Sequence, residues 1–210
     1  MSAVFVEGYG DHRELPSCPN GRASDLAGCK GFYQSIRETC GPAGLSVGIL
    51  GAGGAARAIA VELALAGVNE ITITNRSAER GQALVDLLTS KTNVKAHLVT
   101  LTGNYTIPDP VAIFINATSI GLGDAAARMP VDVQSLRPEL IVADVVFNPP
   151  QSWLMRSAPA RRCRTIVPLG MLVNQAVFCF SLFPGRAPAA RVFRVALAAF
   201  LSIFLSLLSC

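Results

Sequence analysis

A glycine-rich turn is the first segment of this sequence that suggests chemistry. The run Leu45-Ser-Val-Gly-Ile-Leu50 leads directly into Gly51-Ala-Gly-Gly-Ala-Ala56, which places a G-x-G-x-x-A pattern between an expected strand and an expected helix. Gly51 permits a tight turn, Gly53 lets the backbone approach a pyrophosphate, and Ala56 allows the helix to pack closely on the strand. The pattern predicts a dinucleotide-phosphate site, and the alternative is an ordinary glycine turn.

Two arginines follow the next expected strand. This strand ends at Thr74 and is followed by Asn75, Arg76 and Ser77, so Arg76 stands where NAD enzymes carry an acidic residue for the ribose hydroxyl. The planar guanidinium of Arg76 can hold a 2′-phosphate, and Arg80 adds a second cation from the next helical turn. Asn75 and Ser77 offer neutral hydrogen bonds. These residues favour NADP, and the alternative is a solvated helix start with incidental arginines.

The elements that must position these residues alternate along the chain. Short β-branched runs alternate with longer helical ones from about residue 45, which is typical of a parallel sheet with crossover helices. The pattern predicts an α/β fold of the Rossmann type, doubly wound, with a mostly parallel six-stranded sheet. Strands are expected at 45–50, 70–74, 95–99, 111–116, 140–144 and 164–167, and helices at 26–39, 55–66, 78–89, 152–158 and 170–183.

Composition excludes several classes of protein. Of the 210 residues, 51% are hydrophobic and 15% are charged, with a net charge of +4. This content fills a sizeable core, excludes disorder as the main state and gives no support to a nucleic-acid partner. The six cysteines form no C-x-x-C pair, so no metal site is expected. The first six residues have no basic or long apolar segment, which predicts a cytoplasmic protein with reduced thiols.

The last quarter of the chain has a different character. After residue 150 there are seven arginines and no acidic residue, and the 16 residues from Val195 to Cys210 carry no charge. That uncharged run is shorter than the roughly 20 residues that cross a bilayer. We expect an added hydrophobic C-terminal helix over 188–210 that favours self-association or weak contact with a membrane surface.

The sequence resembles the C-terminal two-thirds of the shikimate dehydrogenases, NADP enzymes that reduce 3-dehydroshikimate to shikimate. The resemblance covers roughly residues 23–187. It rests on the G-A-G-G-A turn with N-R-S-x-x-R after the second strand, and on the stretches Asn116-Ala-Thr-Ser119-Ile-Gly121, Val142-Ala-Asp-Val-Val-Phe-Asn-Pro149 and Leu169-Gly-Met-Leu-Val-Asn-Gln-Ala176. It implies a remnant of the substrate domain over 1–22, a leading helix and linker over 23–44, an NADP-binding domain over 45–187, and the apolar helix beyond.

The resemblance also implies roles for individual residues. Phe147, in place of a family Tyr, and Gln175 would touch the small-molecule substrate, shikimate or 3-dehydroshikimate. Without the family, Val145 and Phe147 are core or strand-end residues and Gln175 is an exposed helix residue. The residues expected to bind the cofactor are Gly51, Ala52, Gly53, Gly54, Ala55, Asn75, Arg76, Ser77, Arg80, Asn116, Thr118, Ser119, Val145 and Pro168.

Catalysis is where the sequence departs from the family pattern. Asp25 matches an Asp that partners a catalytic Lys, but it is equally read as the N-cap of the helix that follows. The family's Lys belongs to a substrate domain that this sequence largely lacks, and Pro168 and Arg162 stand where the family has Gly. Two hypotheses follow: an NADP-dependent shikimate or quinate dehydrogenase with little activity as this chain alone, or a binding module that holds NADP without turnover.

Overall fold

A parallel sheet of six strands organises the part of the chain that the computed structural model describes, residues 23–181 together with Val192, Val195 and Ala196. The strand order is β3-β2-β1-β4-β5-β6, and every neighbouring pair is parallel. This is the Rossmann order, with its reversal between β1 and β4. The strands are β1 (Ser46–Leu50), β2 (Glu70–Asn75), β3 (Lys95–Thr100), β4 (Val111–Asn116), β5 (Ile141–Asp144) and β6 (Arg164–Ile166).

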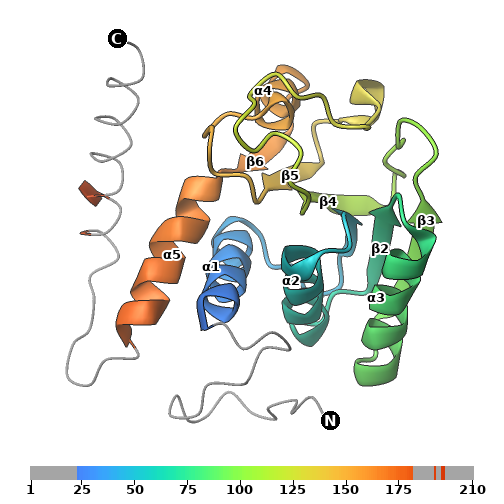
Figure 1. Cartoon of the computed structure of the whole chain (residues 1–210), viewed down its shortest axis with the longest axis horizontal. Coiled ribbons are helices and arrows are strands. Elements are labelled where there is room, and N and C mark those ends of the chain that lie inside the picture. Colours follow the sequence, from blue (N-terminus) through green and yellow to red (C-terminus); the bar gives the residue numbers. More distant parts are fainter. Residues whose placement is uncertain (1–22, 182–191, 193–194, 197–210) are drawn as a thin grey trace.

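Longer helices cover one face of the sheet (Figure 1). They bury apolar side chains such as Phe32, Ile59, Leu63 and Leu84 against the strands, because these residues recur at helical spacing along one face of each helix. This face holds the larger of two cores. The helices on the sheet are α1 (Ala23–Thr39), α2 (Gly54–Leu65) and α3 (Ala78–Lys91), and α5 (Pro168–Ser181) lies on the same side and packs on α1.

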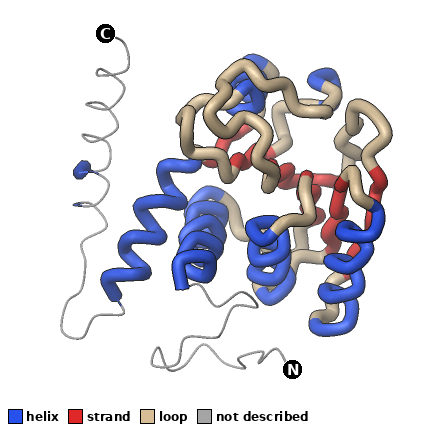
Figure 2. Tube along the Cα trace, viewed as in Figure 1, coloured by secondary structure: helices blue, strands red, loops and turns tan. Residues whose placement is uncertain are grey.

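The opposite face is covered by loops and one short helix, α4 (Trp153–Ala160), with the 3-10 turn η1 (Val133–Ser135) in the loop before β5 (Figure 2). A second apolar core lies here and includes Phe114, Val142 and Leu154. Two arginine side chains hydrogen-bond to the backbone of these loops. Arg137 donates to the backbone oxygens of Asp109 and Val111. Arg161 donates to the backbone oxygens of Gln134 and Leu136. The site region therefore rests on a sheet that is packed on both faces.

The predicted α/β fold and its six strands are confirmed, with differences of one to three residues at the ends of helices and strands. α5 begins at Pro168 rather than at residue 170, because proline fits the first helical position. α1 begins at Ala23, so Asp25 lies within its first turn and not at an N-cap ahead of the helix. The remnant expected over 1–22 and the apolar helix expected over 188–210 fall outside the described residues, apart from the three noted. Within the described residues, no helix combines the length and apolar character that a bilayer span requires.

Candidate functional site

The carboxyl ends of β1, β2, β4 and β5 meet at one edge of the sheet. All four strands run in the same direction, and β1 and β4 are neighbours although they are separated by β2 and β3 in sequence. In open α/β sheets a ligand binds outside the carboxyl ends of the strands, at the point where the strand order reverses. Here that point lies between β1 and β4. The glycine turn after β1, the arginines after β2, and the segments after β4 and β5 all lie at this edge.

Gly51 forms the turn that follows β1. Its φ is 113°, a left-handed value that side chains disfavour. Its backbone N–H donates to the Thr74 oxygen over 2.8 Å, which joins the turn to the end of β2. The Gly51 backbone also lies close to residues 117–118 beyond β4. Gly51 therefore has a conformational role, and it places the residues after it at the sheet edge.

The N-terminus of α2 is open where the sequence predicts a phosphate. Gly53 is the N-cap, with no side chain capping the helix and no acidic residue in the first turn. Gly53, Gly54 and Ala55 are exposed, Ala52 is half-buried, and a Cβ at Gly53 or Gly54 would meet no atom within 4 Å. The first backbone N–H groups of a helix have no partner within it, and they favour an anion. These residues fit a pyrophosphate group.

The residues at the end of β2 and just after it have two different roles. Asn75 and Ser77 serve the local backbone: Asn75 Nδ2 donates to the Ser77 oxygen over 2.8 Å, and Ser77 Oγ accepts from the Arg80 N–H as the N-cap of α3. Arg76 and Arg80 have exposed side chains at the same edge. The arginines are therefore the groups available to a phosphate, and Asn75 and Ser77 hold the turn that carries them.

A buried polar network joins the ends of β4 and β5. Asn116 and Asp144 are paired in the strand register and both are fully buried. Asn116 Nδ2 donates to Asp144 Oδ1 over 2.8 Å, and Asn116 Oδ1 accepts from the Thr118 hydroxyl over 2.7 Å and from its backbone N–H. The side chains of Asn116 and Thr118 thus hold the loop after β4 in place. Ser119, next in the chain, is exposed.

Asp144 and Ser152 complete this network, and neither was predicted as a site residue. Ser152 Oγ donates to Asp144 Oδ2 over 2.6 Å and caps α4 by accepting from the Met155 N–H. Burial raises the pKa of the Asp144 carboxyl above its ordinary value, although the hydrogen bonds from Ser152, Val146 and Asn116 act in the opposite direction. An acidic residue at the end of an otherwise apolar strand was the available sequence signal.

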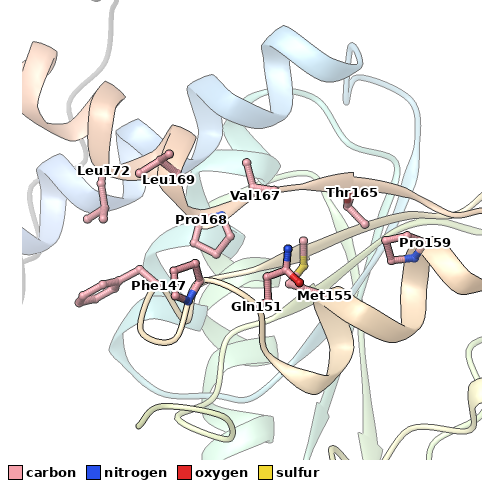
Figure 3. A pocket seen from close by; sticks show the side chains of 10 residues that line it. Phe147, Gln151, Met155, Pro159, Thr165, Val167, Pro168, Leu169 and Leu172 are labelled. Carbon is pink, nitrogen blue, oxygen red and sulfur yellow. The ribbon is translucent and has the colours of Figure 1, made fainter. Parts of the chain in front are cut away.

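An apolar pocket of about 280 Å³ lies between the segment after β5 and the start of α5 (Figure 3). Phe147, which is 45% exposed, and Pro168 both line it, so the structure brings together one residue predicted for the substrate and one for the cofactor. Val145 is half-buried, and its N–H donates to the Asn116 oxygen. The other lining residues are Pro150, Gln151, Met155, Pro159, Thr165, Val167, Leu169 and Leu172.

Gln175 lies on α5 where this helix crosses α1. A Cβ at Gly31 would lie 2.6 Å from the Gln175 nitrogen, so the two helices touch through their backbones. Asn174 Nδ2 donates to Ser35 Oγ over 3.1 Å, and both side chains are buried. Gln175 is half-buried rather than exposed. Asp25 lies nearer the N-terminus of α1, the helix that contacts α5 at Gly31 and Ser35.

Comparisons with known proteins agree with this geometry. The family model for shikimate / quinate 5-dehydrogenase matches residues 37–121. The shikimate dehydrogenase (NADP(+)) of Desulforamulus reducens is 34% identical over 172 residues, which cover 79% of this chain and 58% of the relative. The chain thus spans less than two thirds of the length of that enzyme.

Two solved structures share the fold closely. The ligand-free 5-ketofructose reductase of Gluconobacter sp. strain CHM43 has a TM-score of 0.79 and 45% identity, covering 83% of this chain and 63% of that one. The shikimate 5-dehydrogenase of Listeria monocytogenes, in complex with shikimate and NAD, has a TM-score of 0.73 and 30% identity, covering 81% and 62%. The similarity is therefore confined to part of each of these longer proteins.

Proposed function

The chain belongs to the shikimate dehydrogenase family, and on this premise we propose that it supplies the NADP-binding part of an oxidoreductase that reduces 3-dehydroshikimate to shikimate. The observation that carries the proposal is the open N-terminus of α2 at the sheet edge, next to two exposed arginines and free of acidic side chains in its first turn. When bound, NADPH supplies a hydride to the ketone carbon.

The chain's own residues have distinct tasks in this proposal. Residues 51–55 hold the pyrophosphate, and Arg76 and Arg80 hold the 2′-phosphate with charge-assisted hydrogen bonds. Val145 and Pro168 border the nicotinamide, and Phe147 and Gln175 face the substrate. Asp25 orients the general acid, a Lys that belongs to a substrate domain. We place the reaction in the cytoplasm, in accord with the N-terminal sequence, whose first six residues carry no basic or long apolar segment.

Turnover in this proposal needs a substrate domain, which residues 23–181 do not include. A missing general acid alone costs about 10²- to 10⁴-fold in rate, and lost substrate positioning adds to this. The test is NADPH oxidation with 3-dehydroshikimate. The chain alone is expected to show background rates. Fusion behind the substrate domain of the Desulforamulus reducens relative is expected to give activity that Asp25→Asn lowers. A fusion that binds NADPH without turnover would support the binding module instead.

A second substrate class is favoured by one comparison. The 5-ketofructose reductase is 45% identical over its matched part, against 34% for the Desulforamulus reducens enzyme. Phe147 also lacks the hydroxyl that the family's Tyr offers to a substrate. The same fusion, built with the corresponding domain of the ketofructose enzyme, should be assayed with 5-ketofructose and 3-dehydroshikimate. If the fusion prefers 5-ketofructose, the keto sugar replaces 3-dehydroshikimate as the proposed substrate.

A further inference from the structure

The buried carboxylate of Asp144 lies between the two segments that the proposed function assigns to the nicotinamide half of the cofactor. One segment, 116–119, begins at the last residue of β4, and the other, 145–147, follows β5. Asp144 is fully buried, so it cannot touch the cofactor itself. Any influence on binding must pass through the groups that donate to it.

The hydrogen bonds of Asp144 reach both segments. Its Oδ1 accepts from Asn116 Nδ2 over 2.8 Å and from the Val146 N–H over 2.9 Å. Asn116 in turn fixes Thr118 through two hydrogen bonds, and Thr118 Oγ1 accepts from the Ile120 N–H. One carboxylate therefore sets the path of the backbone after β4 and after β5.

Two further contacts tie the same loops together. The Gly123 N–H donates to the Asn148 oxygen over 2.9 Å. A Cβ at Gly121 would lie 3.3 Å from the Ser152 Cβ, so the loop after β4 packs against the residue that donates to Asp144 Oδ2. The loops after β4 and β5 thus form one connected unit with Asp144 at its centre.

The charge of Asp144 is balanced by dipoles rather than by a cation. All its partners are donors, as an ionised carboxylate requires. Among the described residues no Lys, Arg or His forms an ion pair with it. A buried charge without a counter-ion stabilises a fold poorly. A neutral amide would cost less to bury, which argues that the carboxylate serves the site rather than stability.

We propose that Asp144 is a positioning residue that holds segments 116–119 and 145–147 in the arrangement that binds the nicotinamide half of NADP(H). This inference rests on the proposed function. The proposed function assigns the pyrophosphate to Gly51–Ala55 and the adenosine 2′-phosphate to Arg76 and Arg80, none of which hydrogen-bonds to Asp144 in the described part of the chain. The role therefore affects one half of the cofactor and spares the other.

The experiment compares two ligands on the full chain: NADPH, and adenosine 2′,5′-bisphosphate, which lacks the nicotinamide half. Asp144→Asn is expected to lower the affinity for NADPH at least about tenfold, as for one lost hydrogen bond to a charged group. The affinity for the bisphosphate is expected to change by less than about twofold. Asp132→Asn is the matched control, because Asp132 Oδ1 also accepts from a backbone N–H, that of Gln134. Its affinities for both ligands should stay unchanged.

Ser152→Ala removes only the hydrogen bond to Oδ2 and one helix cap, and it keeps the test decisive if Asp144→Asn does not fold. Ser152→Ala should lower the affinity for NADPH by a smaller factor and leave the affinity for the bisphosphate unchanged. An equal loss of affinity for both ligands, or an unchanged affinity for NADPH in a folded Asp144→Asn protein, would overturn the positioning role. Failure of the unaltered chain to bind either ligand would overturn the proposed function and this inference with it.

Discussion

The Cβ that an alanine would carry at Gly51 would lie 2.8 Å from the backbone oxygen of Ala117. This contact joins the turn after β1 to the segment after β4. The strand order of the sheet reverses between these two strands. The glycine requirement at position 51 is therefore set by the protein's own backbone. At position 53, where a Cβ would meet nothing within 4 Å, the protein itself imposes no such limit.

Gly51→Ala and Gly53→Ala should consequently fail in different ways. Gly51→Ala combines a left-handed φ with a backbone clash and should lower the free energy of unfolding by about 2 kcal/mol or more. Gly53→Ala should cost at most about 1 kcal/mol as a poorer N-cap, while its methyl group occupies the space proposed for the pyrophosphate and weakens NADPH. Urea unfolding and nucleotide fluorescence measure the two effects. Equal stability loss in both variants would contradict this division.

Arg76→Ala should convert a preference for NADP(H) into near-equal binding of NADP(H) and NAD(H). Loss of a hydrogen-bonded charge on the 2′-phosphate should weaken NADPH by about 10- to 100-fold, with little change for NADH, which lacks that group. Fluorescence titration with both nucleotides measures the ratio. Arg128→Ala removes another exposed arginine, from the loop before β5, and serves as the control. An unchanged ratio in Arg76→Ala would remove the phosphate assignment.

The sheet and the turn after β1 could be predicted from the sequence because their signals are local. A strand such as Val111–Asn116 is a continuous apolar run, and the glycine pattern has fixed spacing. The pairing of Asn116 with Asp144 spans 28 positions in sequence, and no local pattern encodes it. The sequence instead suggested Asn116 and Thr118 as cofactor contacts, whereas their side chains are occupied within the protein.

The pH dependence of stability should show that Asp144 binds a proton more readily in the folded protein than in the unfolded chain. Burial raises its pKa above the ordinary value of 3.8. As pH rises from that value, the native state keeps a proton that the unfolded state has released, so the free energy of unfolding falls until the folded pKa is passed. Asp144→Asn lacks this loss. Its stability relative to the unaltered chain should therefore increase from about pH 4 towards neutrality.

The comparison must be made as a difference between the two proteins. Glu62 also has a raised pKa, through burial against the opposing effect of Lys30, and it changes the stability of both proteins equally. Urea unfolding at a series of pH values supplies the difference, with Asp132→Asn as the control for loss of an acidic group. A difference that falls with pH would mean that the hydrogen bonds to Asp144 outweigh its burial.

Arg162→Gly should stabilise the protein. Arg162 follows α4 with a φ of 62°. Its N–H donates to the Pro159 oxygen and the Cys163 N–H donates to the Ala158 oxygen, the two bonds of a Schellman motif, in which the left-handed position is normally glycine. Arginine is strained there, and glycine should add about 1 kcal/mol to the free energy of unfolding, or about 2–4 °C to the melting temperature.

The control is Arg57→Gly, which deletes the same side chain from within α2. Glycine in a helix interior costs about 1 kcal/mol, so the two substitutions should shift the melting temperature in opposite directions. Nucleotide affinity should stay unchanged in Arg162→Gly, because Arg162 lies at the far end of α4 from Ser152 and makes no contact with the proposed cofactor segments among the described residues. A melting temperature that falls in Arg162→Gly would show that the arginine side chain contributes more than its backbone strain costs.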